Sequence, residues 1–104
     1  MAKLIVANWK MNPSGVAEAE RIFRSIVKDA APSVYVAVAA PFIFIPALSA
    51  IKKPRSISLG AQDLFWESSG PFTGEISPRQ LSELGVKYAI IGHSERRAEL
   101  HETD

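Results

Sequence analysis

The sequence predicts a parallel α/β fold of the order β-α-β-α-β-α-β. Four short aliphatic runs recur, each bounded by turn residues: Leu4–Ala7, Val34–Ala39, Ile57–Ala61 and Val86–Ile91. None of them alternates cleanly between apolar and polar residues, which is typical of strands buried on both faces of a sheet. Helical patterns lie between the runs, and strands joined by helical crossovers lie parallel to one another.

The first helix is predicted over residues 16–30, because apolar residues there follow helical spacing while charged residues take the other face. The predicted inward face consists of Val16, Ala19, Phe23, Ile26, Val27 and Ala30. Asn12-Pro13-Ser14 offers a cap before this helix, and Pro32 ends it. A second, short helix is expected from Pro46, which suits a first helical position, through Ala47–Lys53.

The third helix has the clearest local signal. Ser77 and Gln80 form a Ser-x-x-Gln capping box, with a proline at the first helical position between them. Leu81 and Leu84 are predicted to face inward, and Gly85 suits a left-handed terminator.

Composition places the chain among compact globular proteins. Its 104 residues suit one domain, residues 1–104, with 47% hydrophobic and 22% charged residues. The net charge of +1 argues against a nucleic-acid or membrane surface. There is no cysteine, and the apolar run Leu4–Ala7 is far too short for the core of a signal peptide. A cytoplasmic protein is therefore expected.

The longest irregular segment, Gln62–Ile76, lies between the third strand and the third helix. It carries three aromatic residues, Phe65, Trp66 and Phe72. Long loops with exposed aromatic residues in compact domains commonly serve function or an interface, which is the interpretation we favour. The alternative is that these rings fold back onto their own core.

Ligands of parallel α/β proteins bind beyond the carboxyl ends of the strands, so polar residues at those ends are candidates for chemistry. After the first strand, Lys10 can neutralise an anionic substrate, or it is simply a solvated surface lysine. Asn8 either donates a hydrogen bond to a substrate or caps the strand end. For both, the residues alone favour the second interpretation.

His93 follows the fourth strand and precedes Ser94-Glu95, which resemble a helix start. A helix N-terminus disfavours a protonated histidine, and the neutral ring can then donate a hydrogen bond to a carbonyl. The alternative is a chemically idle histidine bonded to the backbone, and spacing alone does not decide between them. His93 and His101 lack a third ligand at suitable spacing, so no metal site is predicted. Arg96-Arg97, flanked by acidic residues, fits ion pairs better than a phosphate site.

Three of these segments resemble the triosephosphate isomerase family closely. The first is Asn8-Trp9-Lys10-Met11-Asn12, and the second combines Gly60-Ala61-Gln62-Asp63 with Gly70-Pro71-Phe72-Thr73-Gly74-Glu75-Ile76-Ser77. The third is Tyr88–Arg97, which spells YAIIGHSERR. The resemblance runs over all 104 residues and departs at Pro71, where the family usually has alanine. It implies a partial (β/α)₈ barrel, a half-barrel with parallel strands.

The resemblance also implies an activity and site residues. The activity is the interconversion of dihydroxyacetone phosphate and glyceraldehyde 3-phosphate through an enediolate, in glycolysis and gluconeogenesis, without metal or cofactor. Asn8 and Lys10 would bind the phosphorylated triose, and Lys10 would also stabilise negative charge. His93 would polarise the carbonyl and move protons between the two oxygens, while Glu95 would orient Lys10.

The same resemblance implies a homodimer. Thr73 would reach into the active site of a neighbouring subunit, and Glu75 would pair with Arg96 across that interface. Gln62 belongs to the same set of predicted dimer residues. The exposed aromatic residues of the loop would then be dimer contacts.

A complete (β/α)₈ barrel needs roughly 250 residues. In the family, the catalytic glutamate, the lid and the phosphate-gripping loops lie beyond the position of Asp104. We therefore expect a chain that is inactive alone and pairs with a second copy or with a complementing C-terminal half. The alternative function is a non-catalytic half-barrel acting in assembly or phosphate binding. Another phosphate-binding (β/α)₈ enzyme is disfavoured by the histidine segment and the Asn-Trp-Lys motif together.

Overall fold

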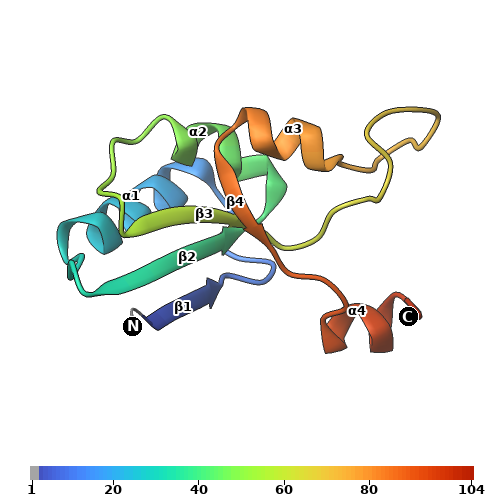
Figure 1. Ribbon diagram of the computed structural model, residues 1–104, viewed down its shortest axis with the longest axis horizontal. Coiled ribbons are helices and arrows are strands. Elements are labelled where there is room, and N and C mark those ends of the chain that lie inside the picture. The colour runs from blue at the N-terminus through green and yellow to red at the C-terminus, as the bar shows by residue number, and fades with distance from the viewer. Residues whose placement is uncertain (1–2) are drawn as a thin grey trace.

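A computed structural model describes residues 3–104 and shows a single four-stranded parallel sheet with helices between its strands (Figure 1). The strand order, β1-β2-β3-β4, follows the chain. The elements are β1 (Lys3–Asn8), α1 (Val16–Lys28), β2 (Val34–Ala40), the 3₁₀ turn η1 (Phe42–Phe44), α2 (Ile45–Ser49), β3 (Ile57–Ala61), α3 (Pro78–Glu83), β4 (Val86–Ala89) and α4 (Ser94–Glu99). The predicted half-barrel fold class is confirmed.

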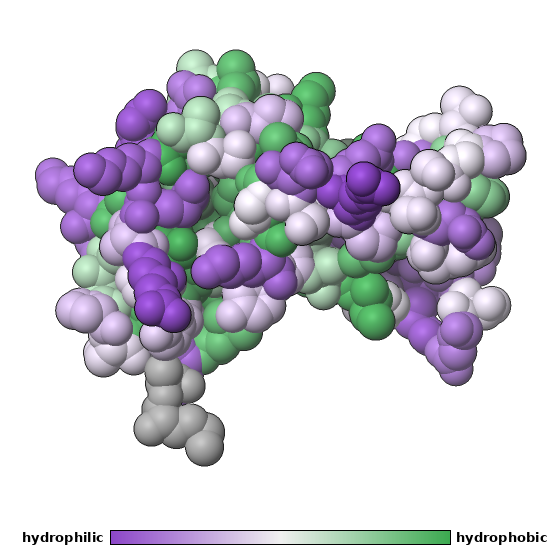
Figure 2. Space-filling model, turned by 45° about the horizontal axis from the view of Figure 1, so that its top comes forward, coloured by the Kyte–Doolittle hydropathy of each residue, from purple (hydrophilic) through white to green (hydrophobic). Residues whose placement is uncertain are grey.

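The hydrophobic core lies between the sheet and the helices that precede β4. Phe23 of α1, Val38 of β2 and Leu48 of α2 are all fully buried. Strand β3 is buried along its whole length, including its one polar residue, Ser58. In contrast, β1 lies at the edge of the sheet and exposes about half of each side chain from Leu4 to Val6 (45%, 53% and 47%). Green apolar atoms also reach the surface among purple polar ones on the face drawn in Figure 2.

The helix α1 begins at Val16, but its predicted cap is wrong. Gly15 occupies the capping position and makes no side-chain hydrogen bond. The side-chain amide of Asn12 instead donates to the carbonyl of Trp9 at 3.3 Å, so it is used before the helix begins. The helix ends at Lys28, short of the predicted end, and its first apolar residue, Val16, is 49% exposed.

The second helix is shorter than predicted. The turn η1 precedes it, α2 begins at Ile45 and ends at Ser49, and Pro46 takes the second rather than the first helical position. The hydroxyl of Ser49 donates to the carbonyl of Pro46 at 3.1 Å, and Lys53 Nζ donates to the carbonyl of Ser49 at 3.4 Å. These local bonds occupy backbone carbonyls at the point where the helix ends.

The capping box of α3 is confirmed. Gln80 N–H donates to Ser77 Oγ at 3.1 Å, and Ser77 N–H donates to Gln80 Oε1 at 2.9 Å. Gly85 has the left-handed conformation (φ 78°) expected of a terminator. Leu81 is buried as predicted, whereas Leu84 caps the helix and is 36% exposed, so the prediction for Leu84 is wrong.

Strand β4 ends at Ala89, two residues before the predicted end. Its pairing with β3 shifts register between Leu59 and Gly60. Ile90 N–H still donates to the carbonyl of Ala61 at 2.9 Å, after which Gly92 (φ 63°) turns the chain toward α4. Within residues 3–104, no helix has both the length and the apolar character needed to cross a membrane.

Candidate active site at the carboxyl ends of the strands

The carboxyl ends of the strands point to one side of the molecule, where the segment before α3 and the helix α4 project from the body (Figure 1). An open hollow of about 640 Å³ lies there. Its lining includes five of the residues predicted from the sequence, namely Asn8, Lys10, Gln62, His93 and Glu95. Residues that are up to 87 positions apart in the chain thus share one concave surface.

The backbone of Lys10 is held in a conformation that non-glycine residues rarely adopt. Its φ is 56°, a conformation that costs of order 1–3 kcal/mol and persists only where the surrounding contacts enforce it. Asn8 Oδ1 accepts from Lys10 N–H at 2.9 Å, and Gln62 Nε2 donates to the Lys10 carbonyl at 2.7 Å. Gln62 Nε2 also donates to the carbonyl of Ala39 at 3.0 Å. Gln62 therefore ties the end of β2 to the strained turn after β1.

Replacing Gln62 with leucine is expected to lower the free energy of unfolding by about 1–3 kcal/mol, because two hydrogen bonds, to the carbonyls of Lys10 and Ala39, are lost at about 0.5–1.5 kcal/mol each. Urea unfolding followed by circular dichroism measures this change. Glu67→Leu is the matched control, since Glu67 is exposed on the loop and is expected to change stability by less than about 0.5 kcal/mol. Equal losses in the two variants would contradict this role of Gln62.

The side chain of Lys10 points to α4. Its Nζ lies 2.7 Å from Glu95 Oε1, and the two side chains are 55% and 51% exposed. An exposed pair of this kind contributes little to stability, so its main effect is to fix where the ammonium lies. The hydrogen bond from Lys10 is the largest cause that lowers the pKa of Glu95, and the positive charge of Lys10 acts in the same direction.

This pair sets a pH dependence with a defined sign. Because the pKa of Glu95 is lower in the folded chain than its ordinary value of 4.5, the pair is complete above that value and is lost as pH falls through the lowered pKa. A ¹³C carboxyl titration is expected to show Glu95 midway at a lower pH in the wild type than in Lys10→Met. Identical midpoints in the two proteins would show that the pair does not exist in solution.

His93 occupies the capping position of α4. Its Nδ1 accepts a hydrogen bond from Glu95 N–H at 3.0 Å. A nitrogen that accepts in this way carries no proton, so the ring proton of the neutral imidazole is on Nε2. His93 Nδ1 also lies 3.8 Å from Glu95 Oε2, a contact that becomes an ion pair only when the ring is protonated. The backbone-bonded histidine that the sequence left open is thus present, and its second nitrogen is still available to donate.

The arginine pair after His93 makes ion pairs, as predicted. Arg96 Nη2 lies 2.8 Å from Glu102 Oε2 and 3.0 Å from Asp63 Oδ2. Arg97 pairs with Asp104. In this chain Arg96 thus has two intramolecular carboxylate partners, and the expected pairing with Glu75 of another copy stays a prediction.

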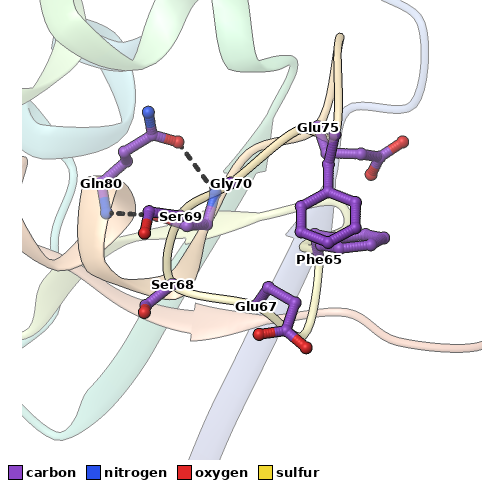
Figure 3. A pocket seen from close by; sticks show the side chains of 9 residues that line it. Phe65, Glu67, Ser68, Ser69, Gly70, Glu75 and Gln80 are labelled. Atoms are coloured by element: carbon purple, nitrogen blue, oxygen red, sulfur yellow. Dashed lines mark hydrogen bonds between the residues drawn. The ribbon is translucent and has the colours of Figure 1, made fainter.

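The loop that carries Thr73 and Glu75 lies away from the hollow. Its rings pack on one another, with 3.9 Å between the centroids of Phe65 and Trp66 and 4.5 Å between those of Phe65 and Phe72. A smaller hollow of about 170 Å³ lies beside these rings, where the side chains of Glu67 and Glu75 point away from Gln80 (Figure 3). Thr73 is exposed on the same loop, and Trp66 is 79% exposed. The loop therefore both folds on itself and presents aromatic surface.

The larger hollow also contains residues that the sequence did not single out. Met11, Pro41, Glu99 and Leu100 line it with the predicted set. Pro41 follows β2 in a segment that has no titratable side chain, and Met11 is 94% exposed. The signal that could have identified Met11 and Pro41 in the sequence is their position close to the ends of predicted strands. Glu99 and Leu100 come from the far end of α4, and no pattern in the sequence indicated which way that helix turns.

Parallel strands that alternate with helices and direct polar residues into a hollow at their carboxyl ends are typical of part of a (β/α)₈ barrel. Comparison with known families gives a match to the model described as triosephosphate isomerase over residues 3–104. The chain belongs to the triosephosphate isomerase family.

Similar proteins come from both bacteria and a fungus. A triosephosphate isomerase of Thermoanaerobacter pseudethanolicus is 45% identical over 104 residues, which covers 97% of this chain and 41% of that protein. The Synechocystis triosephosphate isomerase is 44% identical, and the match covers 100% of this chain and 44% of the relative. That of Coprinopsis cinerea is 41% identical over 92% of this chain and 38% of the relative. The chain thus spans about two fifths of the length of the curated relatives that it matches.

Proposed function

We propose that this chain supplies the electrophilic part of a triosephosphate isomerase active site, in which dihydroxyacetone phosphate and D-glyceraldehyde 3-phosphate interconvert through an enediolate. The observation that carries the proposal is the convergence of Asn8, Lys10, His93 and Glu95 on one hollow. The family and the names of its relatives support the choice of substrate. A cytoplasmic enzyme of glycolysis and gluconeogenesis, working without metal or cofactor, fits this reaction.

Lys10 supplies the positive charge of the site. Its ammonium is held 2.7 Å from Glu95 while more than half of the side chain stays exposed. A fixed cation stabilises both the phosphate of the substrate and the negative charge that develops on the enediolate oxygens. Asn8 Oδ1 is engaged by Lys10 N–H, which leaves the amide nitrogen of Asn8 to donate to the substrate.

His93 supplies the hydrogen-bond donor. With Nδ1 engaged by Glu95 N–H, Nε2–H is the group that can reach a substrate carbonyl over the hollow. Donation there polarises the carbonyl and makes the neighbouring C–H more acidic. The same nitrogen can then give its proton to one enediolate oxygen and take back the hydroxyl proton of the other, which restores the neutral ring.

The reaction also needs a base that removes the carbon-bound proton. Two described carboxylates line the hollow: Glu95 is already paired with Lys10, and Glu99 lies at the end of α4 opposite to His93. We therefore propose that residues 1–104 need a complementing segment, strands five to eight of a family barrel, which supplies the base, the lid and the phosphate-binding loops. Residues 1–104 together with that segment are called the active assembly below.

An isomerase assay on the 104-residue chain, alone and mixed with a fragment of strands five to eight, tests this function. Activity only in the mixture is the expected result. Activity in neither arm would favour the second candidate, a non-catalytic half-barrel acting in assembly or phosphate binding. The second candidate draws support from the exposed apolar residues Leu4, Ile5 and Val6 on the edge strand β1. Such an edge favours association with another strand.

We also propose a homodimer formed through the loop of residues 62–76, because Thr73 and Trp66 are exposed there. In this arrangement Thr73 reaches the hollow of the second copy and Glu75 approaches Arg96 of that copy. Sedimentation of the active assembly is expected to give a dimer, and Trp66→Lys is expected to shift it to the monomer. An unchanged sedimentation coefficient would place the interface elsewhere.

A further inference from the structure

The helix α4 is attached to the sheet in an unusual way. None of its six residues, all within the described part of the chain, is buried, and Leu100 directly after it is 59% exposed. Apolar packing therefore does not hold it, although it carries His93 at its cap and Glu95 in its first turn. Two ionic contacts connect it with the strand ends, Lys10 with Glu95 and Asp63 with Arg96.

The contact between Asp63 and Arg96 is the more sheltered of the two. The side chains of Asp63 and Arg96 are 17% and 32% exposed, against about half for Lys10 and Glu95. Asp63 comes two residues after β3 and directly after Gln62, whose side chain donates to the carbonyls of Ala39 and Lys10. Arg96 is fixed on its other side by Glu102, whose Oε2 accepts from Nε at 2.8 Å and lies 2.8 Å from Nη2. The guanidinium thus joins the end of β3 to α4 and to the segment that follows α4.

The contacts of the Arg96 side chain with Asp63 and Glu102 form a clamp, which also acts on His93 through the backbone. Arg96 N–H donates to the carbonyl of His93 at 2.9 Å. Arg96, whose side chain is held by Asp63, therefore holds the main-chain carbonyl of His93 through its own backbone N–H. Displacing Arg96 would move the capping turn, including the bond from Glu95 N–H to His93 Nδ1.

The carboxylate of Asp63 contributes little to the stability of the folded chain. Burial raises its pKa, and this effect outweighs the lowering by Arg96 and by the Leu64 N–H. Since the raised pKa means that folding favours the protonated carboxyl, the ionised form contributes no stability at neutral pH. A carboxylate retained under these conditions fits a role in orientation better than a role in stability.

We propose that Asp63 is a positioning residue, which acts through Arg96 to fix α4 so that His93 and Glu95 stay aimed over the hollow. The inference rests on the isomerase function proposed above, because it assigns Asp63 to the geometry of that reaction. Its first consequence, the rigidity of the capping turn, is nevertheless measurable without substrate.

The test compares Asp63→Asn with Asp104→Asn in the 104-residue chain. Both substitutions remove one carboxylate that pairs with an arginine of α4, but only Asp63 lies at the end of a strand. Amide exchange of Glu95 N–H is expected to rise about fivefold in Asp63→Asn, the factor that one net hydrogen bond represents, and to stay unchanged in Asp104→Asn. Asp63→Asn is also expected to keep the urea midpoint of the wild type. Unchanged Glu95 exchange in Asp63→Asn, or an equal rise in both variants, would overturn the proposal.

Arg96→Lys gives a second route if Asp63→Asn fails to fold. Lysine keeps the charge but has no planar fork, so it cannot hold Asp63 and Glu102 in the same way. The same rise in Glu95 exchange is expected, and its absence would overturn the proposal. In the active assembly, Asp63→Asn is expected to lower kcat about tenfold with little change in KM, as misplacement of a reacting group does. If no protein shows activity, the proposed function fails while the exchange data still decide the clamp.

Discussion

Replacement of His93 by asparagine is expected to lower kcat of the active assembly by about 10²–10⁴-fold, the range typical for loss of a general acid–base group. Asparagine is among the residues that cap helices best, and its side-chain oxygen can accept from Glu95 N–H as Nδ1 does. The variant therefore keeps the start of α4 and removes only the Nε2–H donor. Steady-state kinetics in both directions measure the loss.

His101→Asn is the matched control for this experiment. His101 follows α4 with φ 58°, a conformation that asparagine tolerates, and it does not line the hollow. The kcat of the active assembly that carries His101→Asn is expected to equal that of the wild type. If the two variants lose equal activity, the histidine of the capping turn is not the electrophile.

Replacement of Phe23 by alanine is expected to lower the free energy of unfolding by about 3–5 kcal/mol, since a fully buried phenylalanine leaves a large cavity. The total free energy of unfolding of a native domain is only about 5–15 kcal/mol, so Phe23→Ala is expected to unfold at a clearly lower urea concentration than the wild type. The ammonium of Lys53 lies 5.7 Å from the centre of the Phe23 ring and loses that contact as well. Urea unfolding followed by circular dichroism measures the change.

Val16→Ala on the same helix provides the comparison. Val16 is 49% exposed, so its truncation is expected to cost less than about 1 kcal/mol. A cost for Phe23→Ala no larger than that of Val16→Ala would mean that the core between α1 and the sheet is not formed in solution.

The parts of the fold that depend on neighbouring residues were predictable from the sequence. The capping box of Ser77 and Gln80 lies within one helical turn, and the conformation of Gly85 follows from its place after that helix. The four strands were placed by their aliphatic runs: β3 has the predicted bounds, and the ends of the other three differ by at most two residues. The clearest failure, the cap of α1, arose because Asn12 bonds backward to Trp9. Spacing cannot distinguish that bond from a cap.

From the sequence, the candidate site could be predicted only as the polar residues that directly follow the strands. That Asn8, Lys10 and His93 meet follows from the parallel order of the strands. The clamp of Asp63 on Arg96 and the bond from Gln62 to the Lys10 carbonyl join residues 33 and 52 positions apart. Such pairs depend on the side-chain directions that the folded sheet sets, and no local pattern encodes them.

The order of the strands has a consequence for how the sheet forms. Each strand pairs with the strand that directly precedes it in the chain, from β1 through β4. Each of these pairings spans one β-α unit, so no strand needs a part of the chain that follows its own unit. The sheet can therefore grow in one direction as a ribosome releases the chain, each new strand adding to the edge that the previous strand has just formed. Synthesis and assembly would then proceed in the same order, from the amino end outward.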